Sequence, residues 1–65
     1  MRIMVNGSAR EVEADTLAAA LEALGHGGAA VATAHNEVFV PAAARAETRL
    51  APGDRIEILA PMQGG

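Results

Sequence analysis

Only one stretch of this 65-residue chain has the periodicity of an amphipathic helix, and that stretch is short. Three leucines recur in it at positions i, i+4 and i+7: Leu17, Leu21 and Leu24. Asp15 or Thr16 is placed to cap the start of the helix, and Gly25 is placed to end it. Because the remaining chain is too short for a second helical layer, we expect an α+β fold in which a single mixed sheet packs on one helix.

The residues before the helix predict a hairpin. Asn6-Gly7 separates two short runs, Arg2 to Val5 and Arg10 to Val12, and this dipeptide is typical of a type I′ turn, which requires positive φ at both central residues. Carboxylates alternate near the second run, at Glu11, Glu13 and Asp15. We expect a solvated strand edge there rather than acid–base chemistry.

Two more strands are predicted after the helix, from Val31 to Ala34 and from Val38 to Val40, with Asn36 in the turn between them. Pro41 ends the second of these strands, and Ala42 to Ala46 predicts a helical turn.

The last strand follows the turn sequence Pro52-Gly53-Asp54. Polar and apolar residues alternate from Arg55 to Leu59, which places Ile56 and Ile58 in the core. Pro61 ends this strand, so the predicted order of elements is β-β-α-β-β-β.

The chain finishes with Gly64 and Gly65, which have no Cβ and therefore form the thinnest segment that a polypeptide allows. Such a segment can enter a narrow tunnel, and its carboxylate has no neighbouring side chain to hinder attack. The alternative is a frayed end, since small residues are common at disordered termini. The strand directly before the diglycine favours a functional tail, residues 61–65, on a single domain that spans residues 1–65.

Composition excludes several classes of site and partner. The chain has no cysteine, which rules out a disulfide framework, a thiolate metal site and a cysteine nucleophile. The spacing of His26 and His35 does not predict a metal site. The glycine-rich stretch from Gly25 to Gly28 lacks the spacing of a phosphate-binding loop. We therefore expect no bound metal, no bound cofactor and no catalytic residue in this chain.

Charge and hydropathy limit the partners further. A net charge of −3, with five scattered arginines and no lysine, argues against nucleic-acid binding. The longest apolar-rich run, Leu17 to Leu24, is too short to cross a bilayer, so we expect a soluble cytoplasmic protein without membrane contacts.

The order of these elements and the diglycine end resemble the β-grasp, or ubiquitin-like, fold, and within it the ThiS family of sulfur carriers. The resemblance covers nearly the whole chain and lies in five segments: Val5-Asn6-Gly7 with Arg10-Glu11-Val12, Asn36 through Val40-Pro41, Ala46 to Leu50, Gly53 to Ile58, and Gln63-Gly64-Gly65. Members of this family are not enzymes.

The resemblance implies that Gly65 is adenylated by an ATP-Mg-dependent, ThiF-like enzyme and converted to a thiocarboxylate. A ThiG-like thiazole synthase then consumes the sulfur, which comes from a donor such as a cysteine desulfurase or a rhodanese-like protein. Met62, Gln63 and Gly64 would enter the partner enzymes with Gly65.

Ordering this tail costs roughly 1–2 kcal/mol per residue, so the body of the protein should dock as well. Met4 and Leu59 alternate away from their inward neighbours, and we expect them to form an apolar docking face on the outer side of the sheet.

The sequence departs from the family at two places. Asn36-Glu37 stands where Asn-Gly is frequent, so a different type of turn is expected there. Pro61 and Met62 replace small or β-branched residues, which is similar to the small subunit of molybdopterin synthase. That carrier is one alternative; a TGS-like ligand- or RNA-binding module and a protein modifier joined to lysine are the others.

Overall fold

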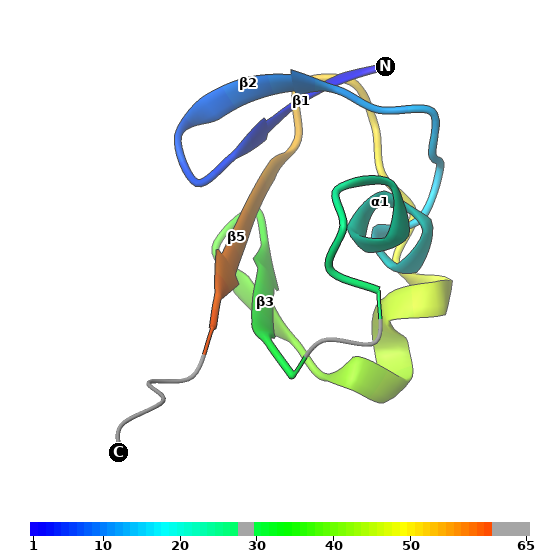
Figure 1. The fold of residues 1–65 in the computed structure, drawn as a ribbon, viewed down its shortest axis with the longest axis vertical. Coiled ribbons are helices and arrows are strands. Elements are labelled where there is room, and N and C mark those ends of the chain that lie inside the picture. Colours follow the sequence, from blue (N-terminus) through cyan, green and yellow to red (C-terminus); the bar gives the residue numbers. More distant parts are fainter. Residues whose placement is uncertain (28–29, 61–65) are drawn as a thin grey trace.

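The computed structural model describes residues 1–27 and 30–60 of the chain. In chain order its elements are β1 (Arg2–Val5), β2 (Ser8–Glu11), α1 (Leu17–Ala23), β3 (Ala32–His35), β4 (Val38–Val40), the 3-10 helix η1 (Ala42–Glu47) and β5 (Arg55–Leu59). The strands form one five-stranded sheet in the order β2-β1-β5-β3-β4. The sheet curves around α1, which confirms the predicted fold and the predicted order of elements (Figure 1).

The predicted N-terminal hairpin is confirmed. Its two strands pair antiparallel from Arg2↔Glu11 to Val5↔Ser8, and the φ angles of Asn6 (50°) and Gly7 (85°) are both positive. The second strand starts two residues earlier than predicted, since pairing resumes directly after the two-residue turn. All residues of β2 are exposed at the edge of the sheet, as expected for the carboxylate of Glu11.

The single helix has well-defined ends. Thr16, rather than Asp15, is the N-cap, and its Oγ1 accepts a hydrogen bond of 3.2 Å from the backbone N–H of Ala19. At the other end Gly25 has a φ of +88°, its N–H donates to the carbonyl of Glu22, and the N–H of residue 26 donates to the carbonyl of Leu21. These two bonds form a Schellman motif, so Gly25 ends the helix as predicted.

The turn between β3 and β4 corrects one expectation. Asn36 and Glu37 have φ angles of 50° and 73°, the same signs as in the N-terminal turn. The prediction of a different turn type is therefore wrong. This turn keeps two positive φ angles, although Glu37 has a Cβ that is sterically strained in this conformation, unlike glycine.

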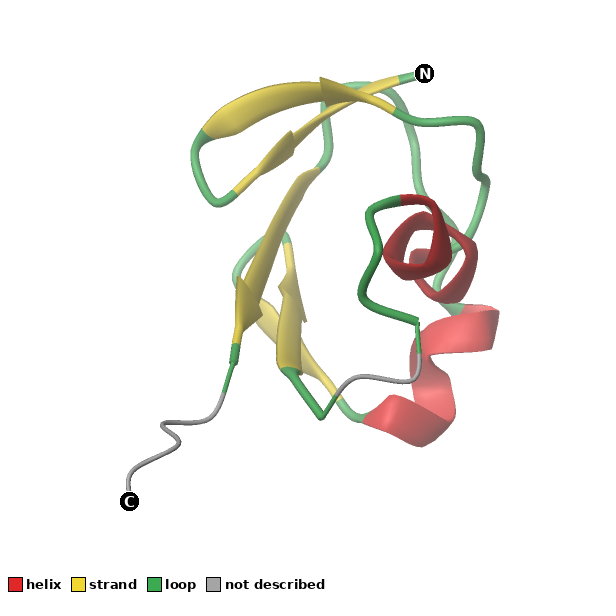
Figure 2. Ribbon diagram, viewed as in Figure 1, coloured by secondary structure: helices red, strands yellow, loops and turns green. Residues whose placement is uncertain are grey.

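The core lies between α1 and the inner face of the sheet. Its buried apolar residues are Ile3, Val5, Val12, Leu17, Ala20, Leu21, Val40, Leu50, Ile56 and Ile58. Strand β5 is central: β1 pairs with it in parallel on one side, and β3 pairs with it antiparallel on the other. Helices α1 and η1 cover the same face of the sheet (Figure 2), and no helix in the described part of the chain covers the opposite face. Within the described residues, no helix is both long and apolar enough for a membrane span.

Candidate functional site

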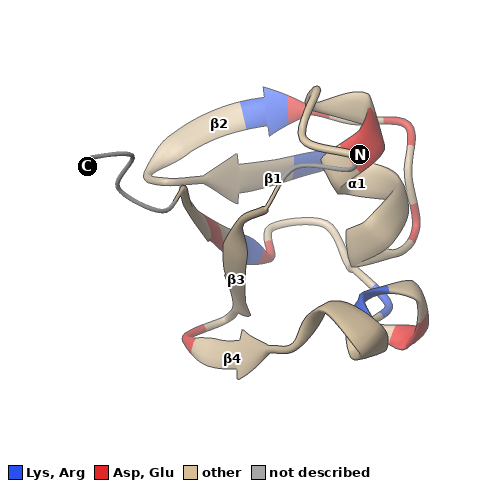
Figure 3. Ribbon diagram, turned by 60° about the horizontal axis from the view of Figure 1, so that its bottom comes forward, with Lys and Arg blue, Asp and Glu red and all other residues tan. Residues whose placement is uncertain are grey.

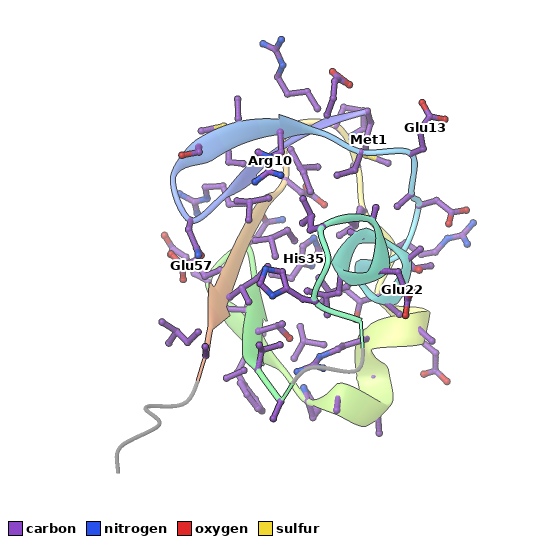
Figure 4. All side chains as sticks on the ribbon, in the orientation of Figure 1. Met1, Arg10, Glu13, Glu22, His35 and Glu57 are labelled. Atoms are coloured by element: carbon purple, nitrogen blue, oxygen red, sulfur yellow. The ribbon has the colours of Figure 1, made fainter. Side chains whose placement is uncertain are left out.

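The site begins at the central strand that leads into the C-terminal tail. Ile56 and Ile58 are buried, as predicted, while Arg55, Glu57 and Leu59 are exposed. Figure 4 shows Glu57 directed away from α1, which identifies the outer face of the sheet. The exposed Ala60 is the last described residue, so the predicted tail residues Met62, Gln63, Gly64 and Gly65 lie outside the described part of the chain.

The two predicted docking residues lie on this outer face but not next to each other. Met4 is opposite Arg55 at the start of β5, whereas Leu59 is opposite Ala32 at the end of the strand. The two positions are four residue steps apart along β5, which is about 13 Å. Leu59 is 70% exposed and Met4 is partly buried, so Met4 and Leu59 do not form one continuous patch.

A residue at the edge of the sheet, rather than Met4, lies on the outer face near Leu59. Phe39 is 66% exposed and is opposite Ala34 in the β3–β4 register, while Leu59 is opposite Ala32. Since Thr33 points into the core, Ala32 and Ala34 point outward with Phe39 and Leu59. We call these four residues the apolar face; it lies on three adjacent strands, beside the end of β5, and the exposed Glu57, which is opposite Ala34, borders it.

The sequence pattern predicts a strand at Phe39 but does not assign its side chain to a surface. The signal was present in the alternation, because the buried Val40 requires its neighbour Phe39 to face the other way. What the sequence lacked was the strand order, which brings β4 within two strands of β5.

An apolar groove borders the apolar face where the chain leaves the sheet. Its volume is about 390 Å³, and it is lined by Ala30, Val31, Ala32, Leu59 and Ala60. The groove therefore lies at the point from which the tail emerges.

Two asparagine side chains hold the backbone of β5. Asn6 accepts a hydrogen bond of 2.8 Å from the N–H of Ile58 through Oδ1 and donates one of 3.1 Å to the carbonyl of Ile58 through Nδ2. Asn36 accepts a hydrogen bond of 2.8 Å from the N–H of Arg55 through Oδ1. The sequence predicts turns at both asparagines but does not predict either contact with β5.

Asp54 connects the loop before β5 to the end of β3 and the β3–β4 turn. Its Oδ2 lies 2.7 Å from Nε2 of His35 and accepts a 2.9 Å hydrogen bond from the N–H of Ala51, and its Oδ1 accepts one of 3.3 Å from Nδ2 of Asn36. The hydrogen bond with His35, followed by that from Ala51, lowers the pKa of the Asp54 carboxyl below its ordinary value. Figure 4 shows His35 on the side of the sheet that faces α1, so this cluster is separate from the apolar face.

The charged residues do not form a basic surface. The five arginines lie on different segments: Arg2 on β1, Arg10 on β2, Arg45 on η1, Arg49 in a loop and Arg55 on β5 (Figure 3). Over residues 1–27 and 30–60, no group of three or more His, Asp or Glu side chains is arranged to hold a metal ion. The absence of a metal and of a bound cofactor stays a prediction.

Comparisons with known proteins agree with this arrangement. The sequence model of the ThiS family matches residues 3–65. Among solved structures, the chain is similar to the thiamine biosynthesis protein (ThiS) from Geobacter metallireducens, with 30% sequence identity, a TM-score of 0.82 and full coverage of both chains. A search of curated protein sequences finds no significant match. The chain therefore belongs to the ThiS family.

Proposed function

We propose that this protein carries sulfur as a thiocarboxylate on Gly65 and donates it for thiazole formation. Membership of the ThiS family supports the general role, a small sulfur carrier protein of thiamine biosynthesis rather than an enzyme. The observation that carries the proposal is the position of β5. This central strand is anchored in the core by Ile56 and Ile58 and ends in the exposed Leu59, five positions before the diglycine in the sequence.

The chemistry needs little from the carrier itself. A carboxylate is a poor electrophile and must be activated. In the site of a ThiF-like enzyme, its oxygen attacks the α-phosphorus of ATP, and pyrophosphate is released. A sulfur nucleophile then attacks the acyl carbon of Gly65 and displaces AMP as the leaving group. Hydrosulfide gives the thiocarboxylate directly, whereas a protein persulfide gives an acyl disulfide, which a thiol then cleaves to release the thiocarboxylate and leave a disulfide. ATP-Mg belongs to the partner, so the carrier provides the carboxylate and a surface by which it is recognised.

The remaining partners follow from the same sequence of steps. The sulfur must come from a donor such as a cysteine desulfurase or a rhodanese-like protein, and a ThiG-like thiazole synthase would consume it. The family match favours a sulfur carrier for thiazole formation over a carrier for molybdopterin synthesis and over a TGS-like binding module. A cytoplasmic location stays a prediction.

Intact mass spectrometry tests the proposal directly. The protein is incubated with ATP-Mg, a sulfur donor and a ThiF-like enzyme that is active on its own carrier. We expect a mass gain equal to the replacement of one oxygen by one sulfur, located in the C-terminal peptide. An unchanged mass would contradict the carrier role, and a bond between Gly65 and a lysine amine would show a protein modifier instead. Adding thiazole synthase or the molybdopterin precursor then identifies the acceptor.

We further propose that the apolar face docks the body of the protein against the adenylating enzyme. Leu59 and Phe39 are exposed by 70% and 66%, and contact with a partner would remove this apolar surface from water. The stabilisation would offset part of the entropy lost when the tail is ordered, roughly 1–2 kcal/mol per residue.

Charge substitutions separate this surface from its surroundings. Leu59→Glu and Phe39→Glu are expected to weaken adenylation by raising KM, whereas Met4→Glu should have the smaller effect because Met4 lies at the far end of β5. Val38→Glu is the matched control, since Val38 is also 66% exposed on β4 but alternates to the other side of the strand. If Leu59→Glu and Phe39→Glu keep the fold and the normal KM, the apolar face is not the docking surface.

A further inference from the structure

The pairing between β1 and β5 is short. It covers the pairs Met4↔Arg55 and Val5↔Ile56, after which the chain turns away at Asn6. The backbone N–H of Asn6 still donates to the carbonyl of Ile56 at 2.9 Å. The next residue of β5 with its backbone groups directed toward β1 is Ile58, because these groups alternate from side to side along a strand.

The side chain of Asn6 continues the ladder where the backbone of β1 has left it. Its amide oxygen accepts from the N–H of Ile58 and its amide nitrogen donates to the carbonyl of the same residue. The φ of +50° at Asn6 suits asparagine better than most other residues. Glycine would tolerate the same turn but has no side-chain amide. Asparagine both adopts the positive φ and bonds to Ile58.

We propose that Asn6 is a positioning residue for the Gly65 carboxylate: by fixing the backbone of Ile58, it fixes the direction in which the chain leaves the sheet. This inference rests on the proposed function of the tail. Without the two Asn6 hydrogen bonds, the backbone at Ile58 has more freedom at the base of the tail. This freedom must be lost on binding, which weakens binding.

The chain contains a matched control for this role. Asn36 also has a φ of 50°, also occupies the first position of a two-residue turn, and also bonds to the backbone of β5. Its partner is Arg55, at the end of β5 that is farther from the tail. Asn6→Gly and Asn36→Gly each remove a side-chain acceptor for a backbone N–H of β5 without straining either turn, but only the first acts near the tail. Asn36→Gly also removes the hydrogen bond to Asp54.

The experiment combines adenylation kinetics with amide hydrogen exchange on the full chain. Pyrophosphate release by a ThiF-like enzyme gives KM and kcat, and NMR detects exchange at Ile58 and Arg55. For Asn6→Gly we expect faster exchange at Ile58 and a KM raised about tenfold, equivalent to about 1.4 kcal/mol, with kcat changed by less than about twofold. For Asn36→Gly we expect faster exchange at Arg55 and little change in KM.

A conservative variant provides the rescue and a second folded test. Asn6→Asp keeps an acceptor for the N–H of Ile58 but loses the donor to its carbonyl, so its KM should lie between those of the wild type and Asn6→Gly. Equal KM values for Asn6→Gly and Asn36→Gly, a normal KM for Asn6→Gly, or unchanged exchange at Ile58 would each overturn the inference. A wild-type protein that is not adenylated would instead overturn the proposed function, and the inference with it.

Discussion

The two ends of β5 are held by the same type of residue in different surroundings. At the start of the strand, Asn36 bonds to the backbone of Arg55 and shares a hydrogen-bonded cluster with Asp54 and His35. At the other end, Asn6 directs both of its side-chain hydrogen bonds to the backbone of Ile58. The first arrangement joins the β3–β4 turn to the loop before β5 and therefore contributes mainly to folding. The second acts near the C-terminal end of β5, where we propose that it mainly positions the tail.

The largest expected effect on adenylation comes from extending the C-terminus. One alanine added after Gly65 should lower adenylation by at least about a hundredfold, because it moves the carboxylate by about 3.3–3.6 Å of extended chain. The melting temperature should stay nearly unchanged, since the added residue lies beyond the core. Pyrophosphate release and thermal unfolding measure the two quantities.

Substitutions in the tail itself provide the controls for this experiment. Gly64→Leu should have a similar effect by widening the segment that must enter the partner, whereas Gln63→Ala should be milder because Gln63 does not react. Normal adenylation of the extended protein, without trimming back to Gly65, would show that the reaction does not require a terminal diglycine.

The next effect concerns stability at the start of β5. Asp54→Ala removes the acceptor for three hydrogen bonds, and we expect the free energy of unfolding to fall by roughly 1–3 kcal/mol. Urea denaturation measures the change. Asp15→Ala is the control, because its 3.8 Å ion pair with Arg49 is exposed and should contribute no more than about 1 kcal/mol. Equal losses in the two variants would show that the cluster around Asp54 does not stabilise the fold.

The contribution of Asp54 should also depend on pH. Its folded-state pKa is lowered, chiefly by the hydrogen bond with His35, so the folded protein binds this proton more weakly than the unfolded chain. The stabilisation is therefore complete above the unfolded-state pKa of about 3.9 and is lost as the pH falls through the lower folded-state pKa. In urea denaturation, the difference in stability between the wild type and Asp54→Asn should shrink over this acidic range. A difference that is the same at neutral and acidic pH would contradict the assignment.

The smallest effect compares the two turns. Gly7→Ala should lower the free energy of unfolding by roughly 1 kcal/mol, because the φ of +85° strains a residue that has a Cβ. The loss is limited to this strain, since an added Cβ would contact nothing within 4 Å. Glu37→Gly should raise it by less than about 1 kcal/mol. The gain is limited because the 3.0 Å ion pair between Glu37 and Arg55, both exposed, is lost. Destabilisation by Glu37→Gly in urea would show that this ion pair outweighs the strain.

Features that depend on neighbouring residues could be predicted from the sequence. The Asn6-Gly7 hairpin, the caps of α1 and the alternation of β5 are each determined by contacts within a few residues. The order β2-β1-β5-β3-β4 follows from pairings between distant segments, which no local pattern shows. Asn6 and Ile58 illustrate the limit, since a turn residue bonds to a strand 52 positions away.

The candidate site shows the same division. Leu59 was identified by alternation alone, whereas its neighbour on the surface, Phe39, could be identified only after β3 had been placed between β4 and β5. Met4 was placed correctly on the outer face, but its distance from Leu59 depends on the register of β1 against β5. The turn at Glu37 could not be predicted because residue type alone favours glycine there.

The position of Phe39 on the shortest strand has a consequence for solubility. An exposed edge strand with apolar side chains can template the addition of further strands, which leads to aggregation. Strand β4 is three residues long, and Pro41 follows it directly with no N–H to offer. Strand β4 thus leaves the one aromatic side chain of the protein exposed while it presents little free backbone at this edge to which a further strand could pair.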